Sequence, residues 1–303
     1  MWWRCCSAFV PFWILLFLSD VPTVCGKALS RKTTNQSCSM CQLLNILVYN
    51  QTNLDAKLDS ISRQNKKLEA KINLLLKGRN NCSQARDCVD IYDCGQKASG
   101  VYTVRPRGKQ PFDVFCDQIT DSGGWTVFQK RVDGSVDFYR GWHDYKVGFG
   151  NLKNEFWLGL DKLNRLTINN KKRYKLRVDL EDTSGNTAYA SYNYFGVSSE
   201  KTNYKLSLGT YYGNAGDSLS YHKSRPFSTK DRDNDGQSGS NCAVTYHSGW
   251  WFHACHTSGL NGAYLHGSHS SLANGINWKS WKGYNYSARR SEMKIRPVGW
   301  IPS

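Results

Sequence analysis

Between Cys41 and Gly78, apolar side chains recur with the seven-residue period of a coiled coil. Leucine or isoleucine fills eight of the ten seam positions, and no proline interrupts the run. An amphipathic helix lying on a domain is the alternative, but the remaining positions are strongly charged. We therefore predict a coiled coil over residues 43–77, with two or three strands. Its seam consists of Leu44, Leu47, Gln51, Leu54, Leu58, Ile61, Asn65, Leu68, Ile72 and Leu75.

The region before this repeat has the layout of a secretory signal. Arg4 precedes a largely apolar run of residues 5–18, which is too short to span a bilayer, and a small residue follows at Gly26. We expect a signal peptide at residues 1–26 and a cysteine-containing segment at residues 27–42. A membrane-anchored type II protein is the alternative. The pattern predicts a secreted, extracellular chain with no membrane span.

Secretion places the eleven cysteines in an oxidising environment, where disulfides persist. Three of them belong to the predicted signal, and the eight that remain are an even number. Cys38 and Cys41 before the coil, and Cys82 after it, are placed to join the chains of a parallel homo-oligomer. Four sequons for N-glycosylation agree with secretion. They begin at Asn35, Asn50, Asn81 and Asn285.

From Arg86 onward the pattern changes to short segments rich in Tyr, Phe, Trp and Val, separated by Gly and Asn turns. No long helix and no repeat of 20–50 residues is evident. These features predict one loop-rich α+β domain over residues 86–300.

Many short motifs in a fixed order give this region a family resemblance over its whole length. They include Phe112–Asp117, Gly123–Arg131, Glu155–Gly159, Gly213–Leu219, Asn241–Ala243, Gly275–Trp278 and Met293–Pro297. The segment resembles the fibrinogen C-terminal domain. It is most similar to ficolins and other acetyl-binding lectins of that family, although it has a coil where ficolins have a collagen-like tract.

The resemblance implies a fibrinogen C-terminal-like fold and two disulfides, Cys88–Cys116 and Cys242–Cys255. Cys94 lies outside that pattern. A local bond with Cys82 and pairing between chains are both open for it.

Three aspartates alternate within residues 231–235, as at the start of an EF-hand motif. Position twelve of such a motif is Cys242 instead of the bidentate Glu, so an EF-hand is excluded. Oxygen ligands crowded on one loop still favour calcium, and a solvated acidic turn is the alternative. The resemblance implies a calcium ion held by side chains or carbonyls of Asp233, Asp235, Gln237 and Gly239. One extra residue before Cys242, relative to most family members, makes the two carbonyls less certain than the aspartates.

The resemblance also implies an acetyl-binding pocket beside this loop, with an aromatic slot for the methyl group and backbone N–H donors for the carbonyl oxygen. The matching positions are Tyr246, Cys255, His256, Leu272, Ala273 and Tyr284. It further implies a cis peptide bond between Ala254 and Cys255. Leu272 departs from the Tyr or Phe of relatives and removes one aromatic wall. Core packing is the alternative for each aromatic side chain, and a structural histidine is the alternative for His256.

Together these features predict a secreted, calcium-dependent, oligomeric lectin that binds acetylated sugars, including microbial surface glycans, in innate immunity. A secreted adhesion or receptor-activating ligand of the angiopoietin-like type, without sugar binding, is the alternative. The positively charged peptide that fibrinogen binds is disfavoured, because Tyr246 and Ala273 stand where carboxylates would be needed.

An enzyme and a nucleic-acid-binding protein both lack support. Residues 216–219 have the sequence Gly-Asp-Ser-Leu, the signature motif of an esterase family, but the Asp-x-x-His motif that such enzymes carry later in the chain is absent from the sequence. The net charge of +16 is spread over the stalk and the domain in short clusters, which indicates a solvated surface. Anionic glycans are the other class of partner that a basic secreted chain would suit.

Overall fold

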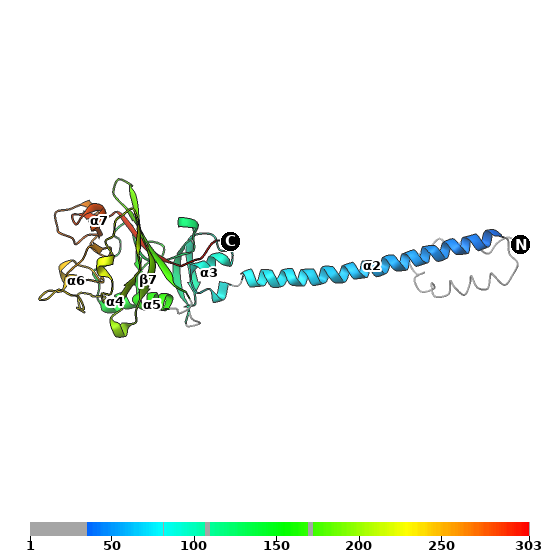
Figure 1. The fold of residues 1–303 in the computed structure, drawn as a ribbon, viewed down its shortest axis with the longest axis horizontal. Helices are drawn as coiled ribbons and strands as arrows, with labels where there is room; N and C mark the ends of the chain where they lie inside the picture. The colour runs from blue at the N-terminus through cyan, green and yellow to red at the C-terminus, as the bar shows by residue number, and fades with distance from the viewer. Residues whose placement is uncertain (1–34, 81, 107–109, 169–171, 303) are drawn as a thin grey trace. The chain divides into compact units, whose positions relative to one another are not determined.

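The structure is a computed structural model that describes residues 35–80, 82–106, 110–168 and 172–302 (Figure 1). The chain separates into two compact units at residue 75. The predicted signal peptide and the Asn81 sequon lie outside the described residues. Among the residues that are described, no helix has the length and apolar character needed to cross a bilayer.

Helix α2 (Asn35–Asn80) makes up the described part of the first unit and continues five residues beyond it. Its side chains are described for residues 43–73, so those of Cys38 and Cys41 lie outside this part. In the single chain the seam is open to solvent, with Leu47 66% and Leu58 67% exposed. An open apolar seam of this length is typical of a helix that a partner helix covers, as in the predicted stalk.

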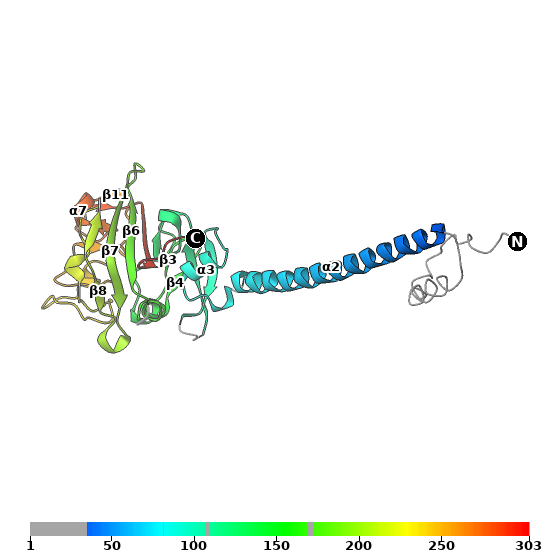
Figure 2. The same ribbon diagram turned by 45° about the vertical axis from the view of Figure 1, so that its right-hand side comes forward.

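The second unit is built on a ten-stranded antiparallel sheet with the central order β1-β2-β3-β14-β6-β7-β8 (Figure 2). The short strands β4, β5 and β9 attach to β5, β3 and β7, respectively. The strands of this sheet are β1 (Gly100–Val104), β2 (Phe112–Asp117), β3 (Trp125–Arg131), β4 (Phe149–Gly150), β5 (Phe156–Trp157), β6 (Tyr174–Glu181), β7 (Thr187–Val197), β8 (Leu206–Leu208), β9 (Tyr211–Gly213) and β14 (Arg290–Pro297).

Two small sheets and short helices complete the domain. The small sheets pair β10 (Ser258–Gly259) with β12 (Asn277–Trp278), and β11 (Gly267–Ser268) with β13 (Tyr286–Ser287). The α-helices are α3 (Cys88–Asp93), α4 (Trp142–Val147), α5 (Leu160–Thr167), α6 (Cys242–Thr245) and α7 (Lys279–Lys282). The 3-10 turns are η3 (Cys82–Gln84), η5 (Thr120–Ser122), η6 (Glu200–Thr202) and η7 (Ser220–His222). This is the α+β fold that the sequence predicts.

The core lies on one face of the sheet, as strand β6 illustrates. Its side chains alternate between buried and half-buried positions, so Leu176 and Val178 point inward while charged residues face out. Aromatic rings fill the space behind it. Trp157 lies 5.8 Å from the ring of Phe227, which lies 5.2 Å from Trp251. All three are fully buried, which explains why so many Trp and Phe residues occur in this part of the sequence.

Three disulfides join the domain within one chain, namely Cys82–Cys94, Cys88–Cys116 and Cys242–Cys255. The last two are the pairs that the resemblance implies. The first answers the question that the sequence left open, because Cys82 bonds Cys94 locally and is not free to join chains. Of the cysteines in the part of the chain that the structure describes, Cys38 and Cys41 remain as candidates for an interchain bond.

Candidate calcium loop and acetyl pocket

The candidate site lies in the irregular region after β9. Helices α6 and α7 of this region lie at the other end of the domain from α3 (Figure 1). The Cys242–Cys255 disulfide brings the two halves of the site together, since Cys242 follows the acidic loop and Cys255 opens the pocket segment. Their Cα atoms are 5.7 Å apart.

The first aspartate of the loop, Asp231, has a structural role. Asp231 Oδ1 accepts hydrogen bonds from the N–H of Trp142 at 2.8 Å and from Thr229 Oγ1 at 2.7 Å. A Cβ atom at Gly141 would lie 2.6 Å from this carboxylate, so any larger residue there would have to displace it. Burial alone would raise the pKa of Asp231, but these hydrogen bonds hold it below its ordinary value. Asp231 therefore fastens the loop to α4.

The other two aspartates shape the loop itself. Asp235 accepts the N–H of Gln237 on Oδ1 at 2.7 Å and the N–H of Cys242 on Oδ2 at 2.8 Å. Asp233 Oδ1 accepts the N–H of Asp235 at 3.1 Å. Burial raises the pKa of the Asp235 carboxyl, the two N–H donors oppose this, and the nearby charge of Asp233 raises it further. A cation beside the two carboxylates would offset this repulsion.

The donor set of this loop fits a calcium ion better than a softer metal. Among the described residues, no three His, Cys, Asp or Glu side chains come together as a metal-binding group. An ion here would depend on the two aspartates and on backbone carbonyls, which are hard oxygen ligands. The carbonyl oxygens of Gln237 and Gly239 accept no hydrogen bond from any described residue. Gly239 has a φ of +83°, which glycine adopts without strain.

The predicted pocket residues form an aromatic cluster centred on His256. The imidazole ring of His256 lies 4.5 Å from the ring of Tyr246 and 6.0 Å from that of Tyr284. Tyr284 Oη donates to the carbonyl of His256 at 2.9 Å. Phe252, which the sequence analysis missed, is buried 5.6 Å from the imidazole. In the sequence it ends a Trp250–Phe252 run that reads as core, so no signal distinguished it.

His256 is held as a neutral imidazole. It is 7% exposed, and Nε2 lies 3.0 Å from the carbonyl oxygen of Ala273. Burial lowers the pKa of His256 to about 4, against which the Ala273 hydrogen bond acts only weakly. A neutral ring that donates from Nε2 leaves Nδ1 unprotonated, and this buried atom has no partner among the described residues. His256 thus supplies a rigid aromatic wall.

The segment around Cys255 is fixed by groups that sequence reasoning did not find. The Ala254–Cys255 peptide bond is cis, and Tyr221 Oη donates to the Ala254 carbonyl at 3.1 Å. The fully buried His222 accepts the N–H groups of Thr257 and Ser258 on Nε2. Their roles depend on contacts more than thirty residues apart, which no local motif reveals.

Leu272 differs from the other predicted pocket residues because its side chain is 63% exposed. It belongs to a loop that Asn285 fastens. The Asn285 amide donates to the carbonyls of His269 and Ser271, each at 3.3 Å. The next residue along this loop is Ala273, whose carbonyl contacts His256.

Asn285→Asp should loosen this loop, because a carboxylate cannot donate to the two carbonyls. We expect faster amide hydrogen exchange at His269 and Ala273 with little change in the melting temperature. Asn50→Asp on α2 is the matched control, as it also removes an exposed sequon asparagine. Unchanged exchange in the Asn285 variant would show that the amide does not hold the loop.

Acid should weaken the domain through its buried histidines. Burial lowers the pKa of His222 to about 3 and that of His256 to about 4, from the ordinary 6.5. At a pH between about 4 and 6.5, these histidines bind protons in the unfolded chain but not in the folded chain. Their contribution to stability is therefore full above about pH 6.5 and falls as the pH drops toward 4. The melting temperature at constant ionic strength should follow this course. His222→Gln should reduce the slope and the exposed His247→Gln should not; equal slopes would contradict the assignment.

Comparison with known proteins identifies the family. Residues 84–298 match the family model for the C-terminal globular domain of the fibrinogen beta and gamma chains, and the chain therefore belongs to this family. It is 52% identical to fibrinogen C domain-containing protein 1 of Xenopus tropicalis, over 73% of this chain and 49% of the relative. Identity to human microfibril-associated glycoprotein 4 is 53%, over 70% of this chain and 85% of the relative. The chain thus spans about half the length of the frog protein.

Solved structures give the same result. The fibrinogen-like globe domain of human ANGPTL6 has a TM-score of 0.68 and 45% identity, and it covers 71% of this chain and 96% of that domain. Lamprey fibrin D-dimer, solved with a Gly-His-Arg-Pro-amide peptide, has the same TM-score and 33% identity, with 89% of this chain and 96% of that chain covered.

Proposed function

We propose that this protein is a secreted, calcium-dependent lectin whose domain binds acetylated sugars. The observation that carries the proposal is the Cys242–Cys255 disulfide, which sets the acidic loop against the aromatic cluster around His256. The loop offers hard oxygen ligands, and the cluster offers an apolar slot with fixed polar groups at its edge.

The chemistry of the cluster suits a neutral acetamide. Transfer of such a group from water into a pocket costs little free energy if its methyl is packed and its carbonyl oxygen receives a hydrogen bond. The rings of Tyr246 and Tyr284 supply apolar surface around the imidazole of His256. The calcium ion would be held by Asp233 and Asp235 and would order the chain between the loop and Cys242.

Oligomerisation through α2 would raise weak single-site affinity by avidity. The open seam supports this part of the proposal, since a helix with its leucines exposed needs a partner surface. Cys38 and Cys41 would then join the chains covalently. Ser218 of the esterase-like label fits a binding protein better than an enzyme, because it is 1% exposed and its hydroxyl bonds Ser280 Oγ at 2.8 Å.

Tyr246→Ala should reduce retention on an N-acetylated resin at least tenfold, since it removes the ring that packs against His256. Tyr212→Ala is the matched control, because Tyr212 is 44% exposed on β9 and takes no part in the cluster. Elution of the unmodified protein by chelator and by free N-acetylglucosamine tests the lectin itself. Retention indifferent to both agents would refute it, whereas undiminished binding by the Tyr246 variant would refute only the pocket assignment.

A receptor-activating ligand is the second candidate, and the 45% identity to the ANGPTL6 globe domain favours it. Receptor signalling that persists in the Tyr246→Ala variant and needs no calcium would support that role over the lectin.

A further inference from the structure

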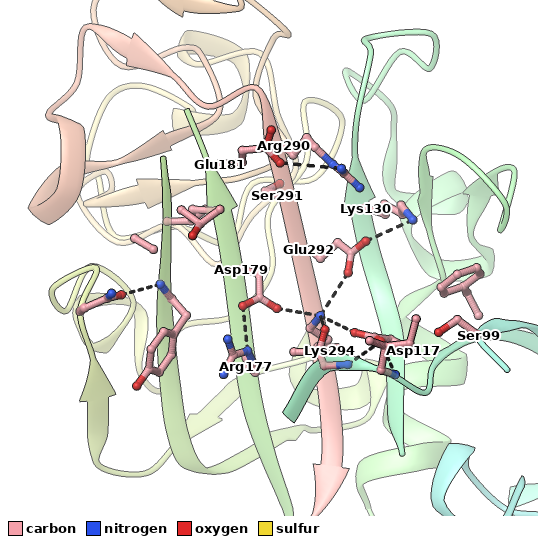
Figure 3. Close-up of a pocket in the computed structure, with 18 residues that line it drawn as sticks. Ser99, Asp117, Lys130, Arg177, Asp179, Glu181, Arg290, Ser291, Glu292 and Lys294 are labelled. Carbon is pink, nitrogen blue, oxygen red and sulfur yellow. Dashed lines mark hydrogen bonds and ion pairs between the residues drawn. The ribbon is translucent and has the colours of Figure 1, made fainter. Parts of the chain in front are cut away.

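A hollow lies on the outer face of the large sheet, and no residue of the calcium loop lines it (Figure 3). Strands β2, β3, β14, β6 and β7 contribute to it, and its volume is about 520 Å³. Charged side chains from these strands occupy it, as the outward half of an alternating pattern. We call it the sheet hollow. Its principal side chains are Asp117, Lys130, Arg177, Asp179, Glu181, Tyr189, Arg290, Glu292 and Lys294.

The register of the strands places these residues in three rows. The middle row runs from Lys130 through Glu292 and Asp179 to Tyr189, across four neighbouring strands. One flanking row begins at Arg290 and the other contains Arg177. Strands lie about 4.8 Å apart and alternate residues about 7 Å apart, so the rows cover roughly 14 Å in each direction. This area is large enough for two sugar rings.

At the floor of the sheet hollow, one buried lysine pairs with three carboxylates. Lys294 is 2% exposed, and its Nζ lies 2.7 Å from Asp117 Oδ2, 2.7 Å from Asp179 Oδ2 and 3.2 Å from Glu292 Oε2. Its ammonium group donates hydrogen bonds to Asp117, Glu292 and Thr120 Oγ1, and it forms an ion pair with Asp179. Removing Lys294 would leave Asp117 without its cation, so this residue serves the fold and is not itself a free ligand contact.

Side chains at the rim of the sheet hollow include hydrogen-bond donors that bond no described residue. Arg177 donates from Nε to Asp179 Oδ1 at 2.7 Å and stacks 4.3 Å above the Tyr189 ring, while its two terminal amino groups bond no described residue. Arg290 approaches Glu181 only to 3.7 Å, and Lys130 Nζ meets Glu292 at 3.1 Å. Arg177 is therefore held in position from two sides with its outer edge free, which is the arrangement that binds oxyanions bidentately.

We propose that the sheet hollow binds a sulfated or uronic-acid-containing saccharide. The backbones of Lys130 and Arg290 stand roughly 8 Å apart, and that of Arg177 stands roughly 12–14 Å from both, so a ligand needs several anionic groups to reach all three. The partly exposed carboxylates between them accept hydrogen bonds from sugar hydroxyls. An acidic peptide fits less well, because the backbone groups of these central strands are already paired and only side chains face it.

Isothermal titration of the full chain with an N- and O-sulfated heparin disaccharide that carries no acetyl group tests the proposal. The double variant Arg177→Gln, Arg290→Gln should bind at least tenfold more weakly. The matched double variant Lys153→Gln, Lys201→Gln removes two exposed cations elsewhere and should bind as the unmodified chain does. Chelator and free N-acetylglucosamine should not compete, which separates this site from the acetyl pocket.

Several results would overturn the proposal. These are no binding by the unmodified chain, equal weakening in both double variants, or equal affinity for an uncharged disaccharide. Equal affinity for a glutamate-rich peptide, lost in the same variant, would assign the hollow to a peptide instead. If the double variant melts early, the single change Arg290→Gln replaces it, because that side chain is 45% exposed and contributes little to stability.

Discussion

Glu155→Gln should lower the free energy of unfolding of the domain by about 3–5 kcal/mol, because it leaves a buried cation without its anion. Glu155 is fully buried, and its Oε1 lies 3.6 Å from Nε of Arg131, which is 2% exposed. The same carboxylate accepts four backbone N–H groups, from Val132, Asp133, Gly134 and Val136. A glutamine keeps the volume but loses the charge, and its amide group faces some of these donors.

Urea unfolding followed by tryptophan fluorescence measures this effect. Glu200→Gln is the matched control, because Glu200 pairs with Lys146 at a side-chain exposure of 36% and should cost about 1 kcal/mol or less. A loss of that small size in the Glu155 variant would mean that the turn after β3 does not depend on the buried charge.

Asp235→Asn should weaken calcium binding about 100-fold, since site affinity follows the number of charged ligands. The asparagine also loses one of the two acceptors that hold Gln237 and Cys242. Calcium titration of the full chain by calorimetry is the measurement, and retention on the acetylated resin should fall with it.

Asp231→Asn provides the control for that experiment. Its Oδ1 accepts both Trp142 N–H and Thr229 Oγ1, and an asparagine oxygen can accept both as well. This variant should bind calcium normally. Equal loss in the two variants would show that loop order, and not ligand charge, controls the site.

The sequence predicts those features that depend on local spacing. The heptads predict α2, the motif order predicts the fibrinogen-type domain, and the resemblance implies the Cys242–Cys255 bond that joins loop to pocket. The alternating aspartates likewise predict the loop. They do not reveal that the Asp231 carboxylate already accepts a hydrogen bond from the first residue of α4. That role depends on a contact across 89 residues.

Other features come only from the packing of distant segments. His222 shapes the chain after Cys255 from more than thirty residues away, and Phe252 is indistinguishable in sequence from its core neighbours. The sheet hollow depends on strand register, which sets Lys130 beside Glu292 although they are far apart in the chain. Hydrophobic alternation predicts that these residues face outward, but not which strands are neighbours.

The decisive test of calcium-dependent acetyl binding is the affinity of the full chain for N-acetylglucosamine compared with glucosamine, measured by calorimetry in calcium and again in chelator. The two sugars differ by one acetyl group. We expect binding of the acetylated sugar in calcium, at least tenfold weaker binding of glucosamine, and loss of binding in chelator. Equal affinity for the two sugars, or binding that chelator leaves unchanged, would contradict it.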